Sequence, residues 1–259
     1  MKQLLIITGA NGQVGSYLAQ AWAETRLPML LLMNSDGRRL EKLSSRPEIM
    51  IKACDLRDLA AFKAALDEAC RALDAVPARL VHTAAIRSYD ARTLVEGEPL
   101  IWSEVFNANV SMAYNVLKAC LPGMLSGKFG RIVMFASNVV QSGLHSGSAY
   151  AAAKAAIVNL VRSVALEAAP DNVLINAISP APVETDLESD YEGEYLAFRQ
   201  RYFAAYRAAS PTGKLVSMQE LKRVAELLLS EELDNLTGQN LVIDGGASTL
   251  LPASPETGN

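Results

Sequence analysis

A glycine-rich turn between an apolar run and an amphipathic segment opens the chain and limits what it can fold into. Residues 2–10 form a short apolar run ending in glycine, which predicts a buried parallel strand. Residues 11–22 then change to a helical pattern with apolar side chains on one face. Gly9, Gly12 and Gly15 therefore fall on a strand-to-helix turn. Glycine there lets the backbone approach a pyrophosphate, whose charge the helix N-terminus attracts.

Apolar runs of strand length recur along the chain, with amphipathic or alanine-rich helical stretches between them. The runs lie at residues 29–33, 49–53, 79–85, 131–136, 173–178 and 240–243. This alternation predicts a parallel sheet covered by helices on both faces, with ligands at the carboxyl ends of the strands. Half of the residues are apolar and no linker stands out. We therefore expect one α/β domain over residues 1–259, a three-layer, doubly wound, Rossmann-type fold, with a flexible tail at residues 250–259.

Charge and cysteine content exclude several classes of protein. The 24 basic and 28 acidic residues give a net charge of −4 without a basic stripe, so we expect no nucleic-acid partner. Three widely spaced cysteines in apolar surroundings favour reduced thiols in a cytoplasmic protein over disulfides or a metal site. His82 and His145 lack partners at metal-ligand spacing. We expect no signal peptide and no membrane span, because no apolar segment approaches the roughly 20 residues that a bilayer requires.

Tyr150 and Lys154 stand four positions apart in a helical stretch, and Ser137 follows an apolar run upstream of them. A phenol normally titrates near ~10, so its use as a proton donor and acceptor near neutrality requires a positive charge that favours the phenolate. A lysine at i+4 shares the helix face of the tyrosine and supplies that charge. The three residues bring a phenol, a cation and a hydroxyl to one carbonyl. A solvated helix turn is the alternative for the tyrosine and lysine pair taken alone.

Five features occur in a characteristic order. They are the glycine turn at residues 8–15, Asp55 with Leu56, Asn109, the group Ser137, Tyr150 and Lys154, and the segment 236–246 that closes on Asp-Gly-Gly. As a set they resemble the short-chain dehydrogenase/reductase family, most closely single-domain members such as 3-oxoacyl carrier-protein reductases and sugar or polyol dehydrogenases. The resemblance covers residues 2–246. It implies an NAD(P)-dependent oxidoreductase that interconverts a carbonyl and a secondary alcohol by hydride transfer.

The resemblance also implies a role for each catalytic residue. Tyr150 would exchange a proton with the substrate oxygen, and Lys154 would hold the nicotinamide ribose and lower the pKa of the phenol. Ser137 would orient the substrate oxygen, and His145 would border the substrate, with a surface loop as its alternative. Asn109 would hold a water that links Lys154 to solvent, with hydrogen bonding in its own helix as the alternative. The cofactor carries the hydride chemistry, so the protein need only fix geometry and stabilise the oxyanion.

The same resemblance assigns the dinucleotide contacts. Asp55 would meet the adenine amino group, with a helix cap as its alternative. The segment 180–185 would cover the nicotinamide, with a rigid proline turn as its alternative. The expected cofactor contacts are Gly9, Asn11, Gly12, Gln13, Val14, Asn34, Ser35, Arg38, Asp55, Leu56, Thr83, Ala84, Ala85, Tyr150, Lys154, Pro180, Val183 and Thr185.

The choice between NAD and NADP depends on the end of the second strand. An acidic residue there binds the adenosine ribose hydroxyls and favours NAD, whereas a nearby arginine accommodates the phosphate of NADP. The matching position is Asn34, followed by Asp36, Arg38 and Arg39. A neutral Asn34 removes repulsion of a phosphate that the arginines can contact, so we expect NADP rather than NAD. Asp36 is the opposing feature, and solvated arginines at a helix start are the alternative.

Some positions depart from the single-domain pattern. The glycine turn has the G-x-x-G-x-x-G spacing of the larger sugar-nucleotide epimerase and dehydratase branch, which residues 82–85 also resemble. Ala181 replaces a glycine and is followed by Pro182, so the conformation of that loop is not inherited. The residues Asp-Gly-Gly at 244–246 and the absence of a long C-terminal substrate domain favour the smaller branch. A nucleotide-sugar epimerase or dehydratase, and a non-catalytic dinucleotide-binding regulator, stay as alternatives.

Substrate recognition is expected in the variable segment, residues 183–215. It carries aromatic residues at helical spacing, interrupted by Arg199, Arg201 and Arg207. Such a segment can form a lid whose arginines meet an anionic substrate. Packing of the aromatics on the core or on a partner subunit is the alternative. By resemblance we expect a homotetramer or homodimer, with the alanine-rich helix after Tyr150 at one interface; its apolar face fits core or interface.

Overall fold

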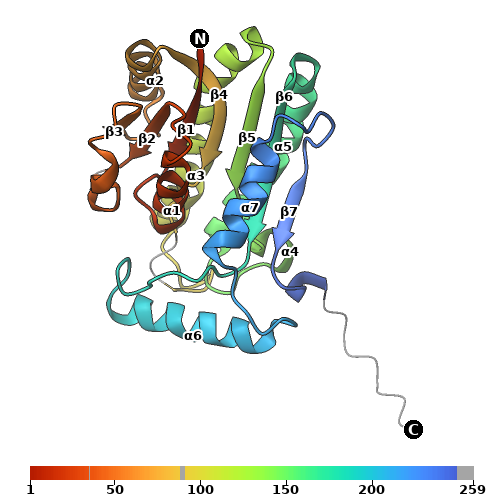
Figure 1. Ribbon diagram of the computed structural model, residues 1–259. Coiled ribbons are helices and arrows are strands. Elements are labelled where there is room, and N and C mark those ends of the chain that lie inside the picture. The colour runs from red at the N-terminus through yellow and green to blue at the C-terminus, as the bar shows by residue number, and fades with distance from the viewer. Residues whose placement is uncertain (35, 88–90, 250–259) are drawn as a thin grey trace.

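Seven strands form one parallel sheet in the computed structural model, which describes residues 1–34, 36–87 and 91–249. The strands are β1 (Lys2–Thr8), β2 (Met29–Met33), β3 (Ile49–Ala53), β4 (Ala75–His82), β5 (Gly130–Phe135), β6 (Val173–Pro180) and β7 (Asn240–Ile243). Their spatial order is β3-β2-β1-β4-β5-β6-β7, so the direction of growth reverses between β1 and β4 (Figure 1). This doubly wound order confirms the fold class, and it predicts ligand binding at the carboxyl side of the reversal.

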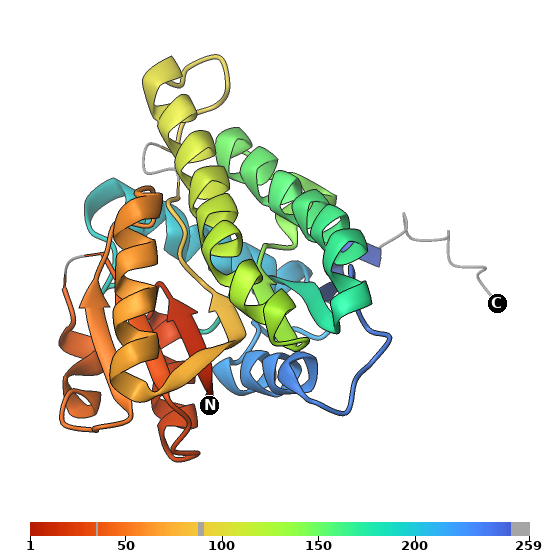
Figure 2. The ribbon, with the colours of Figure 1, turned by 90° about the horizontal axis from the view of Figure 1, so that it is seen from above.

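Helices cover both faces of the sheet (Figures 1 and 2). One face carries α1 (Gln13–Ala23), η1 (Arg38–Leu43) and α7 (Met218–Leu229), and the other carries α2 (Leu59–Leu73), α3 (Pro99–Ser126) and α5 (Ser148–Ala168). The short helices are α4 (Val139–Ser142), η2 (Ala169–Asp171) and η3 (Ala247–Thr249). Helix α6 (Gly193–Ala209) instead crosses beneath the carboxyl ends of the strands, as Figure 1 shows.

Each face of the sheet has its own apolar core, because successive side chains of a strand point to opposite faces. Leu4 and Ile6 of β1 belong to the core under α2, α3 and α5. Leu5 and Ile7 belong to the core under α1 and α7. Strands covered on both faces are continuous apolar runs in sequence, which is why the sequence pattern located most of them.

Strand β4 differs from its expected range of 79–85. It begins at Ala75, and its pairing with β1 continues past Pro77: Pro77 pairs with Leu4 and Arg79 with Leu5, so the register shifts by one residue at Ala78. Proline at such an irregularity interrupts the apolar pattern without ending the strand. Strand β4 ends at His82, so residues 83–85 lie in the loop at the carboxyl edge of the sheet. That loop position suits them to contact a ligand.

Helix α5 carries the tyrosine and lysine pair into the fold. By length and composition alone, the described stretch Ser148–Asp171, which is α5 together with η2, could cross a bilayer, with a mean hydropathy of 1.3. The expectation that no apolar segment approaches the length needed to cross a bilayer is wrong. The mean hydropathy of the segment stays high although it contains isolated charged residues such as Lys154. Core helices of soluble proteins meet the same criterion, and α5 packs against α3 and β6. Of its predicted apolar face, Ala155 is exposed, whereas Ile157, Val158, Val161, Val164 and Ala165 are buried in the core.

Candidate active site

Two connected hollows lie along the carboxyl edge of the sheet. The larger, here called the groove, has a volume of about 690 Å³ and runs past the ends of β1 to β4. The smaller, here called the cavity, has a volume of about 140 Å³ and lies between the ends of β5 and β6 and helix α6. The residues that line both hollows are Val14, Thr83, Ala85, Arg87, Thr185 and Tyr195. A ligand in the groove can therefore reach into the cavity.

The glycine turn brings β1, β4 and α1 into close contact at one end of the groove. Gly9 has φ of +69°, and a Cβ there would stand 2.6 Å from the backbone nitrogen of Ala84. A Cβ on Gly15 would stand 2.3 Å from the carbonyl oxygen of Gly9. Gly12 is the N-cap of α1, and no side-chain hydrogen bond caps the first turn of this helix. The N–H groups of that turn are thus suited to bind a phosphate, so the groove fits a dinucleotide.

Most of the expected cofactor contacts line these hollows. The groove is lined by Gly9, Asn11, Gly12, Gln13, Val14, Asn34, Asp55, Leu56, Thr83, Ala84, Ala85 and Thr185, and the cavity adds Tyr150, Lys154, Pro180 and Val183. Arg38 lines neither; its side chain is 87% exposed and pairs with Asp36, which does line the groove. Ser35 and the tail 250–259 lie outside the described residues.

Gln13 and Arg39 join the glycine turn to the segment after β6. The Gln13 amide donates to the carboxylate of Asp190 at 2.8 Å and accepts from the backbone N–H of Asp186 at 2.7 Å. Arg39 donates to the carbonyl oxygen of Asn11 at 3.1 Å and to Asp190 at 2.7 Å. The segment after β6 is thereby held against the groove. Gln13, expected as a cofactor contact, also has this structural role.

Asp55 lies at the end of β3, where an adenine contact is expected. Its carboxylate accepts a hydrogen bond from Arg57 at 2.7 Å, and this contact holds the pKa of Asp55 below its ordinary range. The alternative that Asp55 caps the next helix is wrong. Asp58 is the N-cap of α2, and its side chain accepts hydrogen bonds from the backbone N–H groups of Ala60 and Ala61. Asp55 therefore does not cap this helix.

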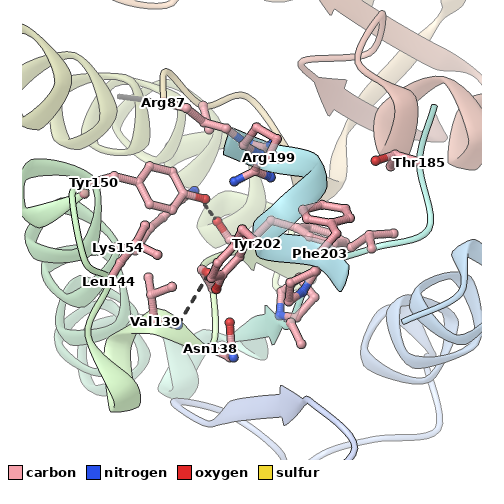
Figure 3. A pocket seen from close by; sticks show the side chains of 18 of the residues that line it. Arg87, Asn138, Val139, Leu144, Tyr150, Lys154, Thr185, Arg199, Tyr202 and Phe203 are labelled. Carbon is pink, nitrogen blue, oxygen red and sulfur yellow. Dashed lines mark hydrogen bonds between the residues drawn. The ribbon is translucent and has the colours of Figure 1, made fainter. Parts of the chain in front are cut away.

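Ser137, Tyr150 and Lys154 meet in the cavity. Lys154 is 1% exposed, its Nζ donates to the carbonyl oxygen of Phe135 at 2.7 Å, and it lies 5.6 Å from the centre of the Tyr150 ring. Figure 3 shows the Tyr150 hydroxyl directed into the cavity. Ser137 Oγ accepts a long hydrogen bond of 3.5 Å from the Val139 N–H, which leaves its proton for a ligand oxygen.

Asn109 and His145 line neither the groove nor the cavity. The Asn109 amide donates to the carbonyl oxygens of Ile86 and Val105, both at 2.7 Å, and accepts from the Ile86 N–H at 3.1 Å. It therefore fixes the loop after β4 on α3, which agrees with the helix hydrogen-bonding alternative. His145 is exposed, does not line the cavity, and contacts the hydroxyl of Ser146 at 2.9 Å. The surface-loop alternative describes His145.

Burial lowers the basicity of two side chains at the centre of the site. Burial, followed by the charge of Arg87, lowers the pKa of Lys154 to about 7. Burial, followed by the charge of Lys154, lowers the pKa of His82 to about 3. Neutral His82 contacts the hydroxyl of Thr8 through Nδ1 at 2.7 Å, so it serves to join β4 to β1.

The lowered pKa of Lys154 predicts a pH dependence of stability. Its folded pKa is about 7 and its ordinary value 10.5. Between these values the unfolded chain binds more protons, so the free energy of unfolding rises with pH across this window. We expect wild type to gain about 2 kcal/mol relative to Lys154→Met between about pH 7 and about pH 9. Urea denaturation of both proteins measures this, and parallel pH profiles would contradict it.

Side chains of α6 form the wall of the cavity opposite Tyr150. They are Tyr195, Phe198, Arg199, Tyr202 and Phe203. The expected variable segment therefore reaches the site, where its aromatics stack on one another. Arg87 was missed by sequence reasoning, although its position shortly after the end of β4 places it at the carboxyl edge.

Comparison with known proteins places the chain in a family. The family model described as enoyl-(acyl carrier protein) reductase matches residues 9–248. The chain belongs to the short-chain dehydrogenase/reductase family. It is thus an NAD(P)-dependent dehydrogenase/reductase. Of the features that carried the resemblance in sequence, the glycine turn, Asp55 with Leu56, and the group Ser137, Tyr150 and Lys154 line the groove or the cavity, whereas Asn109 and the segment 236–246 line neither.

Several proteins resemble this dehydrogenase/reductase over almost its whole length. Oxidoreductase UcpA of Salmonella typhimurium is 31% identical, covering 98% of this chain and 96% of UcpA. The 3-oxoacyl-[acyl-carrier-protein] reductase FabG of Vibrio harveyi is 26% identical, covering 94% of this chain and 96% of FabG.

Solved structures agree with the fold of the enzyme. The 3-oxoacyl-[acyl-carrier protein] reductase of Brucella melitensis matches with a TM-score of 0.82 and 25% identity, covering 95% of this chain and 91% of the reductase. An NAD+-bound xylitol dehydrogenase matches with a TM-score of 0.81 and 26% identity, covering 94% and 98%. ElxO with NADP bound shares the fold, with a TM-score of 0.85 and 22% identity over 96% and 100%. Both dinucleotides therefore occur among these structures.

Proposed function

We propose that this enzyme interconverts a carbonyl and a secondary alcohol, with Tyr150, Lys154, Ser137 and Asn109 as its site residues. One observation supports this most strongly: Ser137, Tyr150 and buried Lys154 line a small cavity at the end of a groove that fits a dinucleotide. Bound NAD(P) would supply or accept the hydride at the substrate carbon. Ser137 and Tyr150 line the same cavity, so the hydroxyl and the phenol can both act on one oxygen.

Each side chain has a task that its surroundings support. Tyr150 gives its proton to the substrate oxygen during reduction and takes it back during oxidation. Ser137 donates a hydrogen bond that orients this oxygen and stabilises its negative charge. Lys154, whose pKa is about 7, places a positive charge beside the Tyr150 ring when it is protonated, and it releases its proton readily. Asn109 positions the loop after β4, and its Oδ1 keeps a lone pair for the water of a proton relay.

Asn34 and Arg38 support NADP as the preferred cofactor. Asn34 lines the groove without a charge, and the exposed Arg38 can exchange Asp36 for the ribose phosphate. We expect Arg38→Ala to weaken NADP binding about tenfold and NAD binding less than about twofold, while Asp36→Asn strengthens NADP binding. Lys42→Ala, on the same short helix, is the control. Isothermal titration calorimetry measures each affinity. Tighter binding of NAD than of NADP by wild type would contradict the proposed preference for NADP.

Assembly and location are further parts of the proposal. The apolar stripe of α5 lies in the core, so an interface would use the outer faces of α3 and α5, where Tyr114 is 51% and Leu166 83% exposed. We propose a homotetramer or homodimer in the cytoplasm that acts on small molecules without nucleic acid or membrane. Light scattering that gives a monomer mass would contradict the assembly.

A screen of carbonyl compounds and alcohols with each dinucleotide tests the activity. A change in nicotinamide absorbance that requires both substrate and enzyme is expected. Substrate conversion with the dinucleotide unchanged in net redox state would instead indicate an epimerase or dehydratase. Conversion of no compound, with the dinucleotide still bound, would indicate a binding protein.

A further inference from the structure

Two arginines point at the space where Tyr150 would act. Arg199 of α6 and Arg87 of the loop after β4 both line the cavity, and Figure 3 shows them near one another above the Tyr150 hydroxyl. Arg87 also lines the groove, whereas Arg199 lines the cavity without lining the groove. Burial, followed by the charge of Arg87, lowers the pKa of Arg199. Two positive charges thus converge on a volume of about 140 Å³.

Aromatic rings hold Arg199 in place without neutralising it. Its Cζ lies 5.7 Å, 5.9 Å and 4.8 Å from the ring centres of Tyr191, Tyr202 and Phe203. Its Nε is buried and has no hydrogen-bond partner among the residues that the structure describes. The ion pairs found within residues 1–34, 36–87 and 91–249 involve other arginines. A fixed guanidinium therefore presents an unused donor beside the reaction site.

Arg87 is held in a similar way at the junction of the two hollows. It donates to the hydroxyl of Tyr191, and its Cζ lies 5.9 Å from the centre of that ring. Tyr191 thus contacts both arginines and keeps them on the same side of the cavity. These contacts already order the two long cationic side chains. Less side-chain conformational entropy is therefore lost when a substrate binds.

We propose that Arg199, together with Arg87, binds an oxyanion carried by the substrate, a carboxylate or a phosphate. The planar guanidinium fork matches both groups with paired hydrogen bonds. Such a group would give Arg199 Nε its missing acceptor and would offset the repulsion between the two cations. The inference rests on the proposed function, because it places this group next to the carbonyl that Tyr150 protonates.

Paired substrates test the proposal. The probes are acetoacetate, levulinate and benzoylformate, each against its methyl ester, and dihydroxyacetone phosphate against dihydroxyacetone. We expect the kcat/KM of wild type to be about 10- to 100-fold higher for the charged member than for the neutral member, in the acid pairs or in the phosphate pair. The pair that shows this preference identifies the anion as a carboxylate or a phosphate. Arg199→Met should remove this preference while changing kcat/KM for the neutral members less than about threefold.

Arg201→Met is the matched control, because Arg201 is an exposed arginine of the same helix that does not line the cavity. It should keep the preference of wild type, and unchanged dinucleotide affinity in both variants verifies their folding. Equal kcat/KM for charged and neutral members in wild type would overturn the anion site while leaving carbonyl reduction intact. An equal loss on both members in Arg199→Met would overturn it as well.

A binding experiment tests the anion site without requiring enzyme turnover. The thermal unfolding temperature of the protein with NADP is compared after addition of benzoate or of benzamide, two compounds of similar size that differ in charge. Stabilisation by benzoate that Arg199→Met abolishes supports the site, and equal shifts with both compounds overturn it. Failure to reduce any carbonyl compound would count against the proposed function alone.

Discussion

Replacing Tyr150 by phenylalanine is expected to lower kcat by about 100- to 10,000-fold, which is the usual contribution of a positioned acid or base. The substitution removes one hydroxyl and keeps the ring beside Lys154, so the packing of α5 should persist. The Kd for the dinucleotide should change less than about threefold, since the groove and Lys154 are untouched. Steady-state kinetics and calorimetric titration of the cofactor give the two quantities.

Tyr114→Phe is the control for this substitution. Tyr114 lies on α3 with 51% of its surface exposed and lines neither hollow, so loss of its hydroxyl should leave kcat within about twofold of wild type. If Tyr150→Phe kept more than a tenth of the wild-type kcat, the phenol would not be the proton donor and the proposed mechanism would fail.

Replacing Gly9 by alanine is expected to lower the free energy of unfolding by about 2–5 kcal/mol. A left-handed residue other than glycine costs about 1–2 kcal/mol, and here φ is +69°. The added Cβ would also stand 2.6 Å from the Ala84 nitrogen, so β1 and β4 must separate at a cost of about 1–3 kcal/mol. Chemical denaturation measures the sum, and the dinucleotide affinity should fall with it.

Gly213→Ala separates the two contributions. Gly213 has φ of +66° but open space around the position of a Cβ, with nothing within 4 Å. Its substitution should therefore cost the backbone contribution alone, about 1–2 kcal/mol. Equal destabilisation by the two substitutions would show that the close approach of β1 and β4 at the glycine turn does not require glycine.

The fold was predictable because a parallel sheet buries its strands on both faces. β2, β3 and β7 have the expected ranges of 29–33, 49–53 and 240–243, since each is an apolar run between polar turns. The start of β4 was misplaced because the register shift that follows Pro77 depends on pairing with β1, and no local sequence pattern indicates such pairing. The catalytic spacing was readable for a similar local reason, since Tyr150 and Lys154 share one helix face.

The long-range part of the site could not be predicted. Gln13 meets Asp186 across 173 positions, and Arg87 meets Tyr191 across 104. These contacts arise only when the loop after β4 and the segment after β6 come together at the same edge of the sheet. For the same reason the hydrogen bonds between the Asn109 amide and the backbone of Ile86 could not be predicted, and the water-relay role of Asn109 stays a prediction.

Transfer of deuterium from a reduced dinucleotide that carries deuterium in place of both hydrogens on the reactive carbon of its nicotinamide tests the central claim most directly. With a carbonyl substrate found in the screen, we predict that the alcohol product carries the deuterium on its carbinol carbon, one per dinucleotide oxidised, as mass spectrometry and absorbance measure together. Product that forms without deuterium, or with the dinucleotide still reduced, would contradict hydride transfer in this site.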